Sequence, residues 1–156
     1  MLNKDVIRNI IILTITFIFL ILLITVISLV TSIIKYKDDN YYIIGNDKIP
    51  SIYNVLGKRK LYSFKNFDDN NKIVYIYKYK DINNPKSDLS NYIDTLKNDY
   101  NYYYTSDINL TLSKGTFQLS NNSMSENMII IIDISYDKDS YEIKITKAHG
   151  TINTYK

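Results

Sequence analysis

The stretch MIIIIDISYDKDSYEIKITK, residues 128–147, decides the fold of the C-terminal part of the chain. It opens with a continuous apolar run at residues 129–132, which predicts a central strand covered on both sides. Residues 137–140, DKDS, then turn the chain, because short polar side chains favour turn geometry. Residues 141–147 alternate apolar and polar side chains, the pattern of a half-buried strand. The stretch therefore predicts two strands joined by a tight turn.

Upstream of this stretch lies the one helix that we predict for the domain. Asn84 followed by Pro85 suits an N-cap and a first helical position, and Ser87 is an alternative cap. Apolar residues then recur at helical spacing and form a single stripe. The stripe, which should cover one face of a sheet, consists of Leu89, Tyr92, Ile93, Leu96 and Tyr100.

Other strands complete the predicted sheet. They are expected at residues 58–64, 73–79, 110–112 and 116–119. The Asp- and Asn-rich residues 68–71 should close a hairpin between the first two. Residues 49–57 contain Pro50 and Gly57, which argue against a regular element there. The prediction is an α+β domain, with one helix packed on a mostly antiparallel sheet.

The N-terminal part of the chain is a candidate transmembrane helix. Residues 10–34 contain no charged residue, no glycine and no proline. As a helix they would span about 37 Å, more than the ~30 Å hydrocarbon core of a bilayer. The alternative is a cleaved signal peptide, whose apolar core runs ~7–15 residues. The length of the segment favours an uncleaved anchor.

The numbers of basic residues on the two sides of this segment are nearly equal, so they do not decide its orientation. Lys4 and Arg8 precede it, and Lys35 and Lys37 follow it. The short tail and the long C-terminal part favour an N-terminus in the cytoplasm, so we expect a single-pass cell-membrane protein with an extracytoplasmic domain. The expected organisation is a cytoplasmic tail at residues 1–9, a transmembrane helix at 10–34, a linker at 35–40 and the domain at 41–156.

The predicted transmembrane helix has a hydroxyl-bearing face. At 100° per residue, four of its hydroxyl residues fall within about 60° of one another. They are Thr14, Thr25, Ser28 and Ser32. Such a stripe can line a helix–helix contact in the membrane. Alternatively, each hydroxyl bonds a carbonyl of its own helix and needs no partner.

Composition argues against several classes of function. The net charge is +3 with both signs mixed, whereas a nucleic-acid-binding domain usually gathers a larger basic excess on one face. The chain has no cysteine, which rules out disulfides and thiol catalysis. We expect no cofactor, no metal site and no nucleic-acid partner.

Three stretches resemble a known group of proteins. They are Ile49-Pro50-Ser51-Ile52-Tyr53-Asn54-Val55-Leu56-Gly57, then Tyr75-Ile76-Tyr77-Lys78-Tyr79, and Tyr92-Ile93-Asp94-Thr95-Leu96. Their order is similar to that in small uncharacterised exported domains of low-GC Gram-positive bacteria, which occur as lipoproteins or behind one membrane helix. The resemblance covers about half of the predicted domain, and Ile52 between Ser51 and Tyr53 departs from the pattern. It implies an exported location and no particular activity.

Candidate catalytic and metal-binding residues are better explained structurally. His149 is the single histidine and has no identifiable nucleophile or orienting partner at a telling spacing. Asp137, Asp139 and Glu142 lack the glycine and the full ligand spacing of a calcium loop. Together with the adjacent acids at residues 68–69, they indicate turns. The sequence therefore predicts no catalytic residues.

Two features could form a binding surface. Lys58, Arg59 and Lys60 could hold an anionic polymer or lipid headgroups, or they could guard a strand edge. The chain also has 16 tyrosines, some in rows that could present a stacking surface or pack in the core. The tyrosines of the candidate surface are Tyr75, Tyr77, Tyr79, Tyr102, Tyr103 and Tyr104.

These observations favour a membrane-anchored, non-enzymatic binding or interaction domain at the cell envelope. Its expected partners are the lipid bilayer and another envelope protein or a wall polymer. One alternative is an envelope-acting hydrolase whose carboxylates are brought together by the fold. Another is a structural subunit that is held in a membrane complex by its transmembrane helix.

Overall fold

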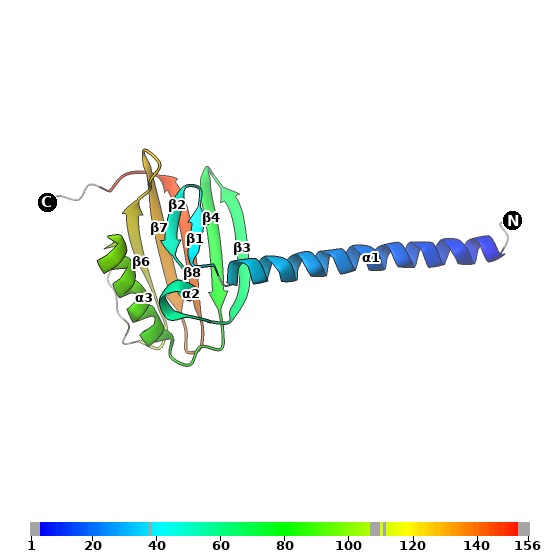
Figure 1. Cartoon of the computed structure of the whole chain (residues 1–156), viewed down its shortest axis with the longest axis horizontal. Helices are drawn as coiled ribbons and strands as arrows, with labels where there is room; N and C mark the ends of the chain where they lie inside the picture. The colour runs from blue at the N-terminus through cyan, green and yellow to red at the C-terminus, as the bar shows by residue number, and fades with distance from the viewer. Residues whose placement is uncertain (1–3, 38, 107–109, 111, 153–156) are drawn as a thin grey trace. The chain divides into compact units, whose positions relative to one another are not determined.

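The structure is a computed structural model that describes residues 4–37, 39–106, 110 and 112–152, with the backbone alone for 30–37. The chain divides into two compact units, Met1–Lys35 and Tyr36–Lys156. Figure 1 shows the elements of both.

The first unit contains helix α1, Lys4–Lys37, up to Lys35. Its part Lys4–Leu29 is long and apolar enough to cross a membrane, a test that an N-terminal signal sequence also meets. Apolar side chains are exposed all round this part, as expected for a helix surrounded by lipid. The helix extends beyond the predicted residues 10–34 at both ends, so residues 35–37 of the predicted linker are helical.

The second unit is built on a six-stranded sheet. Its strands are β3 Leu61–Asp69, β4 Lys72–Tyr79, β5 Tyr103–Tyr104, β6 Gly115–Asn122, β7 Met128–Tyr136 and β8 Tyr141–His149. Their spatial order is β3-β4-β8-β7-β6-β5, and every neighbouring pair is antiparallel. Asn70 and Asn71 turn the β3–β4 hairpin with positive φ angles, 47° and 64°, which asparagine tolerates. The α+β class is confirmed.

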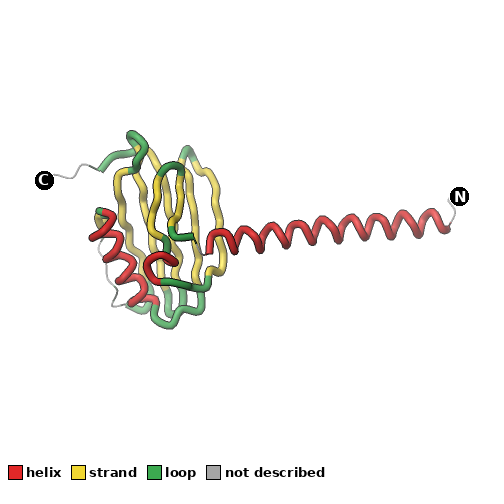
Figure 2. The backbone as a smooth tube through the Cα atoms, viewed as in Figure 1, coloured by secondary structure: helices red, strands yellow, loops and turns green. Residues whose placement is uncertain are grey.

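Helix α3, Pro85–Tyr100, covers part of one face of this sheet, here called the inner face (Figure 2). Its stripe residues Leu89, Ile93 and Leu96 are fully buried. They meet a sheet surface that is equally apolar, since alternate residues of β7 and β8 are buried there. Asn84 caps the helix as predicted, its Oδ1 accepting the Ser87 N–H at 3.2 Å.

A small hairpin, which the sequence analysis did not predict, covers the neighbouring part of the inner face (Figure 1). Its strands are β1 Tyr41–Ile44 and β2 Asp47–Pro50. The ring of Tyr42 lies 4.2 Å from that of Tyr77, centroid to centroid. The hydroxyls of Tyr42 and Tyr79 are 2.8 Å apart, and the Tyr42 hydroxyl also accepts the Ile52 N–H at 3.1 Å.

The prediction of an irregular stretch at residues 49–57 is wrong. Pro50 ends β2, and helix α2, Ile52–Leu56, follows it. The side chain of Ser51 accepts the Asn54 N–H at 3.1 Å, which caps the start of this helix. Gly57, at φ 73°, donates to the Tyr53 carbonyl and ends it. Caps at both ends thus stabilise a helix of only five residues.

Three strand predictions also need correction. The strand expected at residues 58–64 begins at Leu61, because residues 58–60 lie in the loop after α2. Residues 110 and 112 lie in a turn and a bend rather than a strand, and residue 111 lies outside the described residues. In β7, Ile130 and Ile132 are buried on the inner face, whereas Ile129 and Ile131 on the opposite, outer face are half-buried. Within the described residues, β7 is therefore fully covered on its inner face and only partly covered on its outer face.

Candidate functional site

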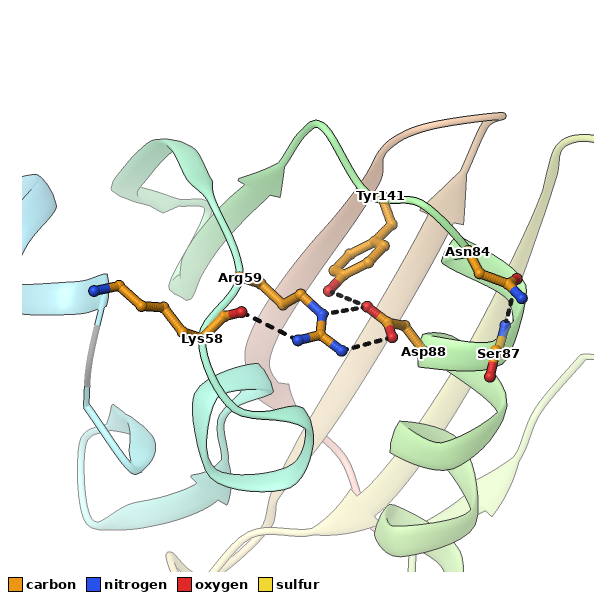
Figure 3. Close-up of polar contacts among 6 residues, drawn as sticks. All are labelled: Lys58, Arg59, Asn84, Ser87, Asp88 and Tyr141. Atoms are coloured by element: carbon orange, nitrogen blue, oxygen red, sulfur yellow. Dashed lines mark hydrogen bonds and ion pairs between the residues drawn. The ribbon is translucent and has the colours of Figure 1, made fainter.

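The predicted basic cluster, Lys58, Arg59 and Lys60, lies in the loop between α2 and β3. Arg59 turns toward Asp88 and binds its carboxylate with two hydrogen bonds (Figure 3). Nε donates to Oδ2 at 2.6 Å, and Nη2 donates to Oδ1 at 2.9 Å. Paired bonds of this kind are the strongest contact between arginine and a carboxylate. The charge of Arg59 is thereby engaged within the domain.

Asp88 is positioned by the first turn of α3, where the N-terminal end of the helix favours a negative charge. The Tyr141 hydroxyl lies 3.5 Å from its Oδ2, so the carboxylate is nearly enclosed (Figure 3). The pKa of Arg59 is raised, chiefly by the hydrogen bonds to Asp88, while burial acts in the opposite direction. The pair fastens the basic loop to α3.

Lys60 forms an ion pair with Asp81, so a second cation of the cluster has an acidic partner. Lys58 makes no ion pair with any residue that the structure describes. An open cavity of about 360 Å³ adjoins the loop, and both acids face it. It is lined by Lys58, Arg59, Lys60, Asp81, Ile82, Asn83, Asn84 and Asp88. Because two carboxylates offset two cations here, Lys58 supplies the remaining attraction for an anion. The anion-binding surface stays a prediction.

The predicted tyrosine surface is divided between the core and the exterior. Tyr77, Tyr79 and Tyr102 are buried, and Tyr75 is half-buried in the same row. These side chains follow the core alternative left open by the sequence. Burial raises the pKa of Tyr79 and Tyr102, so their hydroxyls stay protonated well above neutral pH.

Tyr103 and Tyr104, by contrast, are exposed on the short edge strand β5. The Lys97 ammonium lies 4.4 Å from the ring centroid of Tyr104, within the range of a cation–π contact. Of the six predicted tyrosines, these two present their rings to solvent.

A buried charged cluster was missed by the sequence analysis. The Nζ of Lys147 lies 2.7 Å from Asp47 Oδ2 and donates to Ser125 Oγ at 2.8 Å. The carboxylate of Asp47 also accepts from the Ser123 hydroxyl at 2.7 Å and from the Met124 N–H at 2.6 Å. Both charged side chains are more than nine-tenths buried. The cluster ties the β1–β2 turn to the β6–β7 connection and to β8.

One sequence signal could have revealed this cluster. Lys147 continues the alternation of Tyr141, Ile143 and Ile145, which places its side chain on the buried face. A lysine at such a position needs a buried acidic partner. Asp47 lies 100 residues away, and no local pattern connects the two.

The outer face brings two carboxylates to one open cavity of about 450 Å³. Asp133 accepts from Gln118 Nε2 at 2.6 Å and lies 3.6 Å from the Lys144 ammonium. Glu142 pairs with Lys78 at 2.6 Å. These are the acids that a hydrolase would draw on, and each is joined to a lysine of a neighbouring strand.

The residues set aside as structural lie as follows. His149 ends β8 with its side chain exposed. Residues 137–140 form the β7–β8 turn, closed by the Asp137 N–H donating to the Ser140 carbonyl at 2.9 Å. Asp68 and Asp69 belong to β3, next to the asparagine turn. Within the described ranges no three His, Asp or Glu side chains converge as metal ligands would.

The hydroxyl face of α1 makes bonds within its own helix. Thr14 donates to the Ile10 carbonyl at 2.9 Å, and Thr25 donates to the Leu22 carbonyl at 2.8 Å. Such bonds to carbonyls of the same helix are those expected if the hydroxyls need no partner helix. The side chain of Ser32 lies outside the described residues. A helix–helix contact through this face stays a prediction.

The two edges of the sheet differ in length. β5 has two residues, whereas β3 has nine and pairs with β4 alone. Past the irregularity between Leu61 and Ser63, β3 follows a regular register up to Asp69. Phe67 is 45% exposed there. Along the described residues β3 is therefore a long, regular edge with an exposed aromatic ring.

Comparison of the chain with models of protein families, with curated proteins and with solved structures finds no match. The resemblance to exported domains of low-GC Gram-positive bacteria therefore stays a prediction.

Proposed function

We propose that this chain is a membrane-anchored, non-enzymatic interaction domain of the cell envelope, with its C-terminal domain outside the cytoplasm. Helix α1 supports the anchoring, because its part Lys4–Leu29 is long and apolar enough to cross a bilayer. The long domain that follows it supports the orientation.

The observation that carries the proposal is the open edge of β3. A strand at a sheet edge presents unpaired backbone N–H and C=O groups, and proteins use such edges to add a strand from a partner. The edge of β3 is long and regular between Ser63 and Asp69, whereas the opposite edge is only two residues long. The contact element of the domain is therefore β3.

The charged groups of the domain support interaction over catalysis. The acids of its clusters are engaged by basic partners: Asp88 by Arg59, Asp47 by Lys147, and Glu142 by Lys78. A glycosidase-type hydrolase needs a protonated acid and a free carboxylate converging on one bond. Carboxylates neutralised by lysine or arginine are better suited to holding strands and loops together.

Photo-crosslinking in intact cells tests this function. A photoreactive phenylalanine analogue replaces Phe67 in the full chain, and a matched variant carries it at Asn98, which is exposed on α3. We expect a discrete crosslinked product from position 67 and little from position 98. The absence of any product from position 67, or equal products from both, would contradict an interaction through β3.

Two further experiments test the location of the domain and the alternative that the chain is a structural subunit held by its transmembrane helix. Protease added to intact cells should remove the domain but not α1, because the domain lies outside. Deletion of residues 38–156 also removes the probe at position 67, so association of the remaining α1 is followed by co-purification with the protein that position 67 captures, and we expect none. Association that survives this deletion would assign the contact to the transmembrane helix instead.

A further inference from the structure

Among the described residues, the charged side chains on the outer face of β3 have no ionic partner. On the outer face, ion pairs join Lys78 to Glu142 and Lys144 to Asp133 across neighbouring strands. Lys65 and Asp69 lie on the same face of β3 and make no ion pair with any described residue. Asp69 lies opposite Lys72 in the β3–β4 register, yet no ion pair within 4.0 Å joins the two.

These charges are arranged symmetrically about an exposed aromatic ring. Lys65 lies two residues before Phe67 and Asp69 lies two residues after it, so all three side chains share the outer face. In an antiparallel pair of identical strands centred on Phe67, Lys65 of each copy lies opposite Asp69 of the other. The two Phe67 side chains lie opposite each other on the axis.

Other antiparallel registers are less favourable. A pair centred on Lys65 places two ammonium groups face to face, and a pair centred on Asp68 does the same with two carboxylates. Like charges directly opposite each other destabilise a strand pair. A pair centred on Asn66 is free of that conflict but forms no Lys–Asp pair. The register centred on Phe67 alone combines two ion pairs with an aromatic contact.

We propose that the partner of β3 is β3 of a second copy of this chain, paired antiparallel about Phe67. This inference rests on the proposed function and names the partner of its contact element. Asp69 then lies between Lys72 of its own chain and Lys65 of the other. The two six-stranded sheets join into one continuous sheet, and the backbone groups along the β3 edge of each copy are paired.

The membrane makes so small a contact effective. The regular pairing covers residues 65–69, whereas a stable interface in solution uses roughly 20–30 residues on each side. Two anchored copies share one membrane, which raises their effective concentration without any new contact. The pairing therefore belongs to the full chain in its membrane, and the released domain stays monomeric.

Disulfide trapping tests the register directly, because the chain contains no cysteine. In the proposed pair the two Cα atoms at position 67 lie about 4.5–5.5 Å apart, within the range of a disulfide. The full-length Phe67→Cys variant, oxidised in membranes, should give a covalent dimer as its main product. Tyr62→Cys is the matched control, being 55% exposed on the same strand. Its two copies would lie about 33 Å apart in this register.

A charge reversal shows whether the covalent dimer forms in the proposed register or by random encounter of two chains. In the Phe67→Cys background, Lys65→Asp places two carboxylates opposite each other, and the dimer yield should fall several-fold. Adding Asp69→Lys restores opposite charges, so the yield should return. A Tyr62→Cys dimer as abundant as the Phe67→Cys dimer would overturn the proposal, as would an unchanged yield in Lys65→Asp or no recovery in the double reversal.

The two proposals can fail separately. If photo-crosslinking from position 67 captures a different protein and Phe67→Cys gives no dimer, the interaction domain stands and self-pairing is overturned. If position 67 yields no product by either chemistry, the interaction function falls together with its partner.

Discussion

Helix α3 and the β1–β2 hairpin cover neighbouring parts of the inner face, but they are attached in opposite ways. The helix presents a continuous apolar stripe, in which Leu89 and Leu96 are fully buried. The hairpin is attached at two polar points, the Tyr42 hydroxyl and the Asp47 carboxylate. Apolar contact is divided among many atoms and weakens gradually, whereas a buried polar contact leaves an unsatisfied group when either partner is removed.

This difference can be measured on the fragment of residues 38–156. The compact unit beginning at Tyr36 should fold without α1, as a soluble monomer. Urea unfolding of the fragment then gives the free energy of each variant. Aggregation or lack of structure in the fragment would contradict a self-sufficient core.

The largest effect is expected at the polar attachment of the hairpin. Asp47→Ala leaves the buried Lys147 ammonium without its carboxylate, and such a loss costs about 3–5 kcal/mol. The double variant Asp47→Leu with Lys147→Met removes both charges and should recover most of that loss. If the unfolding free energy of Asp47→Ala lies within about 1 kcal/mol of that of the native fragment, the polar attachment of the hairpin is contradicted.

A slightly smaller loss is expected at the apolar attachment of the helix. Leu96→Ala removes a fully buried side chain and should lower the unfolding free energy by about 2–5 kcal/mol. Asn98→Ala, at an exposed position of the same helix, is the control. A cost below about half a kilocalorie for Leu96→Ala would mean that the stripe does not carry the packing of α3.

The same contrast explains which elements the sequence could predict. The stripe of α3 recurs at helical spacing from Leu89 to Tyr100, so its buried face can be read directly. The strands of the hairpin have four residues each, too few for alternation to stand out. Their attachment depends on contacts such as that between Asp47 and Lys147, which the chain separates by 100 residues.

The candidate site follows the same rule. The basic run at residues 58–60 is visible as a local pattern, but its electrostatics depend on acids that lie far along the chain. Asp88 is 29 residues from Arg59, and Asp81 is 21 residues from Lys60. Local composition therefore located the cluster and overstated its free positive charge. The open edge of β3 could not be predicted in this way, because it depends on the order of the strands in the sheet, which no single segment of sequence contains.

Removing one hydroxyl from the hairpin should have a moderate effect. Tyr42→Phe keeps the ring against Tyr77 but deprives the Ile52 N–H of its acceptor and Tyr79 of its hydroxyl partner. Loss of a partner for buried polar groups costs about 1–3 kcal/mol. Tyr62→Phe, on an exposed ring, should leave the unfolding free energy unchanged. Equal losses from the two variants would show that the Tyr42 hydroxyl does not hold the hairpin.

The smallest effect concerns acid, and it distinguishes the two attachments by pH alone. Burial by itself raises the pKa of Asp47, but hydrogen bonds from Lys147, the Met124 N–H and Ser123 outweigh it and lower the pKa below its ordinary value of 3.8. A carboxyl whose pKa is lower in the folded chain contributes stability that is fully present above the unfolded pKa. That contribution is lost as the pH falls through the folded pKa.

The stability gap between the native fragment and Asp47→Asn should therefore stay constant from about pH 7 to pH 5 and narrow below that range. Protonated Asp47 resembles the neutral amide, so the two proteins become alike in acid. The gap between the native fragment and Leu96→Ala should not change, because leucine does not titrate. Urea unfolding of all three at several pH values checks both statements. A gap for Asp47→Asn that persists in strong acid would mean that the Asp47 carboxylate is not what fastens the hairpin.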